Sequence, residues 1–155
     1  LRHLVEAKVK AGTQAVFADV VYVKRNDPSR VVRYYQSKGF TPERVADGWM
    51  PAHPTVIVDR EAFEQYGGYA LDYEIASDYD MMIRIFHQER LSFTYVPEVA
   101  VRMRMGGLSS SSARNIWILN NEIVRSCRKY GIRTSVFRLL LKVPHKLVEL
   151  AKRPG

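Results

Sequence analysis

The feature that most constrains the fold is a run of β-branched and aromatic residues that is followed by a turn and by a second segment of strand composition. Residues 14–23 (QAVFADVVYV) have the composition of one or two strands. Residues 26–29 (NDPS) are turn formers, and residues 30–35 (RVVRYY) have strand composition again. This order predicts a β-hairpin. Because helical patterns surround the hairpin, the chain belongs to the α/β or α+β class.

The remaining elements follow from apolar spacing and from residues that start or stop helices. Further strands are predicted at 55–59, 92–96 and 100–105, with Pro97 separating the last two. Thr41 and Asp59 are candidate caps, residues 109–112 (SSSS) offer another, and Gly131 is a candidate C-terminal stop. Helices are predicted over 1–10 (stopped by Gly12), 41–48, 60–68, 77–90 and 113–130.

Composition limits the class of protein. The chain has 155 residues of which 46% are apolar, enough for one domain with a real core. A single cysteine, Cys127, excludes an internal disulfide framework and a cysteine-based zinc site, which fits a reducing, cytoplasmic setting. No apolar run reaches the roughly 18–20 residues of a membrane span. The chain begins at Leu1 without a signal-peptide pattern, so we expect it to be part of a longer protein.

Charge is distributed unevenly along the chain. The formal net charge is +8, but residues 1–100 carry 12 Lys/Arg against 14 Asp/Glu, whereas residues 101–155 carry 12 against 2. The excess in the last third indicates contact with phosphates, anionic lipid or nucleic acid. The alternative is a solvated basic helix face. The tail over 132–153 combines apolar residues with cations and predicts an amphipathic helix, kinked at Pro144, that lies on anionic lipid or packs on the domain.

Two aspartates in residues 76–84 (ASDYDMMIR) stand among small and apolar neighbours. Positions two apart lie on opposite sides of a helix, so Asp78 and Asp80 cannot do the same job. Asp80 lies four residues before Arg84 and can form an ion pair with it. Asp78 is near the helix start, where it either caps free N–H groups or acts as a general base in a cleft. The residues alone leave both roles open.

Three further groups have the chemistry of a sugar or phosphate site. His53 lies between Pro51 and Pro54, where a stiff loop can hold it towards a ligand or towards the backbone. Trp49 can stack on a sugar ring or fill the core. Arg102 and Arg104 lie two residues apart on a predicted strand and therefore share a face; they are followed by a glycine loop and Ser109. Two guanidinium groups on one face suit a diphosphate, and the alternative is a solvated sheet face.

These segments occur in an order that resembles the C-terminal half of family 2 glycosyltransferases, in particular bacterial enzymes that build cell-surface polysaccharides. The ordered set is GWMPAHPTVIVDREAFEQYGGY, IASDYDMMIRI and FTYVPEVAVRMRMGGLS, and the resemblance covers about residues 1–112. It implies an α/β GT-A fold, here its acceptor-side part, with a mixed sheet and flanking helices. Residues 113–155 would then be a basic helical extension.

The resemblance also implies an inverting transfer from a nucleotide sugar to a saccharide or lipid-linked acceptor. Its catalytic base aligns with Asp78, and Ser77 stands where many relatives have Glu. We expect His53, Trp49, Asp80, Arg102, Arg104 and Ser109 to contact substrates. Such enzymes work in the cytoplasm, and this one would work at the inner face of the cytoplasmic membrane.

The sequence also departs from the family pattern. The resemblance implies a divalent cation, Mg²⁺ or Mn²⁺, yet the histidine that many relatives carry in the glycine loop is replaced here by Met105-Gly106-Gly107. The Asp-x-Asp motif that holds metal and donor is expected before residue 1, so residues 1–155 alone should not catalyse. The rival interpretation is a non-enzymatic basic module that binds nucleic acid or membrane through residues 101–155.

Overall fold

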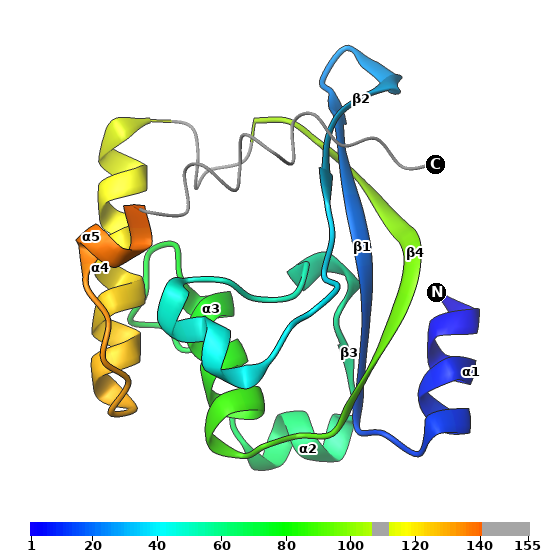
Figure 1. Cartoon of the computed structure of the whole chain (residues 1–155), viewed down its shortest axis with the longest axis horizontal. Helices are drawn as coiled ribbons and strands as arrows, with labels where there is room; N and C mark the ends of the chain where they lie inside the picture. The colour runs from blue at the N-terminus through cyan, green and yellow to red at the C-terminus, as the bar shows by residue number, and fades with distance from the viewer. Residues whose placement is uncertain (107–111, 141–155) are drawn as a thin grey trace.

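Strand β1 (Ala15–Lys24) is the centre of a four-stranded sheet, because every other strand pairs with it. The computed structural model describes residues 1–106 and 112–140 (Figure 1). Strands β2 (Asp27–Tyr35) and β3 (Ile57–Val58) are antiparallel to β1, and β4 (Phe93–Arg104) is parallel to it. Because β4 pairs with both ends of β1, β2 and β3 share the opposite edge. The sheet is therefore mixed, as expected for an α/β protein.

The predicted hairpin is confirmed, but the two strands predicted around Pro97 are one. In the pairing of β1 with β4, Phe17 lies opposite Tyr95 and Asp19 lies opposite Val99, so β4 has additional residues at this point. Proline has no N–H to give to the ladder. The chain therefore bulges at Pro97 and then resumes the same strand, instead of ending there.

Helix α1 (Arg2–Ala11) ends as predicted at Gly12, which has a left-handed φ of 65°. The predicted helix at 41–48 is instead the 3₁₀ helix η1 (Pro42–Asp47). Another 3₁₀ turn, η2 (His53–Thr55), precedes β3. Neither Thr41 nor Asp59 makes a side-chain cap, and Asp59 instead accepts a hydrogen bond from Lys8 at 2.5 Å.

The helix predicted over 77–90 has two parts: α3 (Ser77–Met82) runs on without a break into the π-helical turn η3 (Ile83–Gln88). The separate helix α2 (Arg60–Gln65) comes before them in the chain. Wider i→i+5 turns of this kind are rare and occur frequently at functional sites. The first turn of α3 carries both aspartates identified in the sequence.

The last helices are α4 (Ala113–Lys129) and α5 (Val136–Leu140). The side chain of Ser112 accepts a hydrogen bond from the N–H of Asn115, which confirms a cap in the serine run. Gly131 has a φ of 72°, and Ile132 N–H bonds back to Cys127 C=O at 2.8 Å, so the predicted stop is also confirmed. Ser109 and the tail beyond residue 140 lie outside the described residues.

The sheet separates two clusters of apolar side chains. On one face Phe17 packs with Phe40, Phe86 and Phe93, and this main core extends to α3, η3 and α4. On the other face Leu4 of α1 covers the smaller cluster (Figure 1). α4 contributes Ile123, Val124 and Cys127 to the main core, α5 contributes Leu139, and Ile132 joins the core from the segment between the two helices. Among the helices within residues 1–106 and 112–140, none has the length and apolar character to cross a membrane.

Candidate functional site

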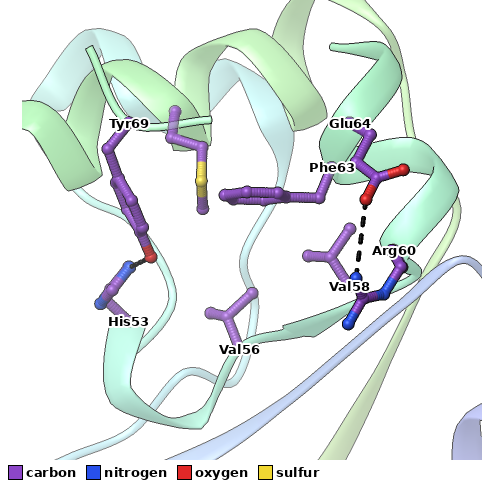
Figure 2. A pocket seen from close by; sticks show the side chains of 8 residues that line it. His53, Val56, Val58, Arg60, Phe63, Glu64 and Tyr69 are labelled. Carbon is purple, nitrogen blue, oxygen red and sulfur yellow. Dashed lines mark hydrogen bonds and ion pairs between the residues drawn. The ribbon is translucent and has the colours of Figure 1, made fainter. Parts of the chain in front are cut away.

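A pocket of about 460 Å³ lies between η2, β3 and α2, with one residue of α3 in its wall. Its floor is apolar and its two ends are polar (Figure 2). At one end the ring Nε2 of His53 lies 3.0 Å from the hydroxyl of Tyr69, and at the other Arg60 pairs with Glu64 at 3.7 Å. The apolar lining consists of Val56, Val58, Phe63 and Met81. An apolar surface with convergent polar groups is typical of small-ligand sites.

The position of His53 follows from the local chain. Pro54 begins the turn of η2, and Thr55 fixes it to β1 by accepting from the Ala18 N–H at 3.0 Å and donating to the Ala18 C=O at 2.9 Å. The sequence left open whether His53 points towards a ligand or towards the backbone. In the structure its imidazole lines the pocket and contacts the Tyr69 side chain. Tyr69 comes from the loop after α2, within the GGY motif.

Asp78 interacts electrostatically with His53 and Tyr69, which form one end of this pocket, although it is not part of the pocket wall. It is half-buried, and its Oδ1 accepts a hydrogen bond from the N–H of Tyr79 at 2.7 Å. Burial raises the pKa of Asp78, against the lowering effects of the electrostatic interaction with His53 and of nearby backbone N–H groups. Burial and the negative charge of Asp78 together raise the pKa of the Tyr69 phenol. These three groups form one electrostatic unit.

Asp80 has a different environment, which corrects its expected role in substrate contact. Its side chain is fully buried, and its Oδ1 accepts hydrogen bonds from Tyr73 at 2.9 Å and Ser126 at 2.8 Å. Oδ2 accepts from Tyr130 and Arg84, both at 3.2 Å. Although burial acts to raise the pKa of Asp80, these bonds and the nearby cations lower it below its ordinary value. Asp80 therefore holds α3 in place and does not face a ligand.

The ion pair predicted between Asp80 and Arg84 is present, and Arg84 extends it. Its guanidinium donates to the carbonyls of Tyr66, Gly67 and Gly68 at 2.5–2.9 Å. These carbonyls follow the end of α2, where a cation is favourable. Arg84 thus joins α3 to the loop that leads to Tyr69.

Trp49 packs against the main core, as in the second of its two predicted roles. Its ring stacks on Tyr35 with 6.4 Å between centroids and lies under the guanidinium of Arg44 at 4.1 Å. It is not part of the pocket wall. This environment favours a structural role for Trp49.

Arg102 and Arg104 share one face of β4, as expected, and both are exposed. They lie opposite Val21 and Val23, towards the hairpin end of the sheet, and neither lines the pocket. Arg102 donates to the carbonyl of Pro28 at 2.9 Å. The arginines therefore form a separate exposed group, and Ser109, expected near them, lies outside the described residues.

Part of the basic excess after residue 100 is neutralised inside the molecule. Four cations of this region pair with acidic residues from the first hundred, at distances of 2.6–3.6 Å. The pairs are Arg114–Glu74, Arg125–Asp72, Lys129–Asp80 and Arg138–Asp47. The charge asymmetry of the sequence thus has an intramolecular explanation for these residues.

The resemblance implies a divalent cation, and we expect most of its ligands outside residues 1–155. Within residues 1–106 and 112–140, no three His, Cys, Asp or Glu side chains are grouped so that they could hold a metal ion. A cation would need ligands from elsewhere, and we assign no step to it.

Sequence reasoning missed Tyr69, Phe63 and Met81 as pocket residues and Glu122 as a support of the site. Tyr69 and Phe63 lie within the DREAFEQYGGY motif, so the motif pointed to this region without indicating which side chains face a cavity. Glu122 is one of two acidic residues after position 100, and its isolation in a basic segment was a usable indication. No known family model matches the chain, and no curated protein matches it.

Proposed function

We propose that the chain is the acceptor-side part of an inverting, nucleotide-sugar-dependent glycosyltransferase of the GT-A fold, with Asp78 as general base. One observation carries the proposal: Asp78 is a half-buried carboxylate with a raised pKa that interacts electrostatically with His53 and Tyr69, the two residues that close one end of the pocket. A general base is most effective when its pKa approaches the working pH. The resemblance in motif order supports the same residue.

The reaction is a single displacement. Asp78 takes the proton of the acceptor hydroxyl while that oxygen forms a bond to the anomeric carbon of the donor sugar. The bond between this carbon and the diphosphate oxygen breaks, and the nucleoside diphosphate leaves with the electron pair, which inverts the anomeric configuration. His53 and Tyr69 orient the acceptor. Arg102 and Arg104 remain proposed contacts for the diphosphate, but they lie outside the pocket, so this role requires a donor, held mainly by residues before position 1, that extends from the pocket to the hairpin end of β4.

The substrates belong to the same proposal. The donor is a nucleotide sugar and the acceptor a saccharide or lipid-linked saccharide of cell-envelope polysaccharide synthesis, used at the cytoplasmic face of the membrane. The pocket volume of about 460 Å³ falls within the size range of small-ligand sites. Among the described cations that the rival role as a basic module would use, Arg114, Arg125, Lys129 and Arg138 form ion pairs within the molecule.

The test is Asp78→Asn in the full-length protein that contains this chain, with Asp72→Asn as a matched control. Asp72 is exposed and pairs with Arg125 on the surface. Loss of a general base predicts a fall in turnover of about 10²–10⁴-fold, with donor affinity and the unfolding midpoint unchanged. Asp72→Asn should transfer sugar at the wild-type rate. Wild-type turnover in the Asp78→Asn protein contradicts the proposal.

A further inference from the structure

The carboxylate of Glu122, in the middle of α4, accepts hydrogen bonds from three consecutive backbone N–H groups. Oε1 accepts from Glu74 at 2.7 Å, and Oε2 accepts from Ile75 at 2.9 Å and Ala76 at 2.8 Å. Consecutive amides that converge on one anion form a nest, and bonds to a charged acceptor are stronger than neutral ones. Burial acts to raise the pKa of Glu122, but the three N–H bonds and Arg125 lower it below its ordinary value. Glu122 is therefore ionised at neutral pH.

The backbone held by Glu122 is the start of the helix that carries Asp78. Ala76 precedes the first residue of α3, and Asp78 follows two residues later. α3 has no side-chain cap of its own, although it runs on into η3. Helices in proteins are stabilised mainly by tertiary contacts. The bonds to Glu122 are such contacts, and they act on the backbone just before Asp78.

A second contact from α4 holds the other side of Asp78. Ser126 lies four residues after Glu122, on the same face of α4. Its hydroxyl donates to the buried Asp80 at 2.8 Å, and Lys129 lies 3.6 Å from the same carboxylate. α4 thus holds the chain on both sides of Asp78, at residues 74–76 and at Asp80.

We propose that Glu122 is a positioning residue for Asp78, and this rests on the proposed function. Glu122 contacts no substrate; it keeps the start of α3 fixed so that the Asp78 carboxylate stays beside His53 and Tyr69. The titratable groups that act on Asp78, or respond to it, come from three elements: His53 from η2, Tyr69 from the loop after α2, and Tyr79 from α3. α4 is accordingly part of the catalytic unit.

The test compares Glu122→Gln, Glu122→Asp and Val124→Ala in the full-length protein. Gln places an amide N–H₂ where one oxygen accepts, so it cannot satisfy all three N–H groups. Asp keeps the charge on a shorter side chain and should restore function in part. Val124→Ala removes buried methyl groups from the same helix without touching residues 74–76, so it controls for general loosening of α4.

Three measurements separate positioning from general stability. In Glu122→Gln we expect turnover to fall by about 10–100-fold with the acceptor KM within about threefold of wild type, because misplacement by about 1 Å costs this much. Amide hydrogen exchange at residues 74–76 should become faster. The pKa of Asp78, followed through ¹³C-labelled aspartate, should fall towards its ordinary value, since the carboxyl loses burial, the effect that raises its pKa. Val124→Ala should leave that pKa unchanged.

The outcomes distinguish this inference from the proposed function. If wild type transfers sugar and Asp78→Asn does not, but Glu122→Gln keeps the wild-type rate and Asp78 pKa, the positioning role is refuted alone. If wild type transfers no sugar, the proposed function fails, and the Asp78 pKa and the amide exchange still decide whether Glu122 fixes this carboxylate. An equal shift of the pKa in Val124→Ala also refutes a specific role. If Glu122→Gln does not fold, Glu122→Asp provides the same comparison.

Discussion

The buried Asp80 network allows a quantitative prediction about stability. Asp80→Asn keeps the size of the side chain and one acceptor oxygen, but it removes the charge that faces Arg84 and Lys129. The amide nitrogen would also face hydroxyl groups that now donate to the carboxylate, from Tyr73, Ser126 or Tyr130. The substitution thus breaks a buried ion pair and leaves several donors unsatisfied.

The expected cost is at the lower end of the range for such changes. Removal of one partner of a buried ion pair costs about 3–5 kcal/mol. Arg84 keeps its three carbonyl partners and the Lys129 side chain is 52% exposed, so neither cation is stranded completely. We therefore expect a loss of about 3 kcal/mol in the free energy of unfolding. The same substitution at Asp72, whose pair with Arg125 is exposed, should cost about 0.5 kcal/mol.

Urea denaturation measures both variants, with the fluorescence of Trp49 as a probe because this ring packs against the main core. For a denaturant slope of about 2 kcal/mol per molar, the midpoint of Asp80→Asn should fall by about 1.5 M and that of Asp72→Asn by about 0.25 M. Equal, small shifts in the two variants would show that the buried network adds no net stability.

The pH dependence of this difference follows from the sign of the pKa shift. The pKa of Asp80 is lowered in the folded state, so its stabilising effect is complete above the unfolded value of about 3.9 and is lost as the pH falls through the folded value. The difference in the free energy of unfolding between wild type and Asp80→Asn should be constant above about pH 5 and should become smaller below about pH 4. A gap that widens on acidification contradicts the assignment.

Two further predictions concern the loop beside Arg84 and the electrostatics of Asp78. Gly67→Ala should lower the free energy of unfolding, measured by urea denaturation, by at least about 2 kcal/mol, because φ is +76° and the new Cβ would lie 2.8 Å from the guanidinium of Arg84. Gly12→Ala is the control: φ is +65° with open space around the residue, so the loss should be about 1 kcal/mol. Equal losses would exclude the contact with Arg84 as the cause. His53→Gln removes an electrostatic interaction that lowers the pKa of Asp78. The acidic limb of the pH–rate profile should therefore move to higher pH, and a move to lower pH contradicts the arrangement described here.

Local features were predictable because they depend on residues close in sequence. The hairpin follows from composition, but the turn predicted over residues 26–29 lies at residues 25–26 instead, since Asp27 already pairs with Lys24 and begins β2. The ends of α4 follow from Ser112 and Gly131. The continuation of β4 through Pro97 was not predictable, since it requires β1 as a partner. The sequence pattern also could not distinguish the 3₁₀ turn at Pro42–Asp47 from an α-helix, because both begin with the same residues.

The candidate site was predictable only in part for the same reason. Motif order indicated Asp78 and His53, and the i→i+4 spacing indicated the pair of Asp80 with Arg84. The bonds between Glu122 and residues 74–76 join positions 46–48 apart in the chain. Such contacts depend on how α4 packs against α3, which no local pattern encodes. The exposure of Arg102 and the burial of Trp49 were likewise decided by tertiary packing.

The bulge at Pro97 has a consequence for how copies of this chain meet in solution. Among the described residues, β4 pairs with a strand on one side only, so its other side is a sheet border where a second molecule could add a strand. A proline and an irregular register in the middle of that border interrupt the row of hydrogen-bonding groups that such a strand would need. Pro97, which keeps β4 from being a regular strand, thereby also opposes the addition of a strand from a second copy at this edge.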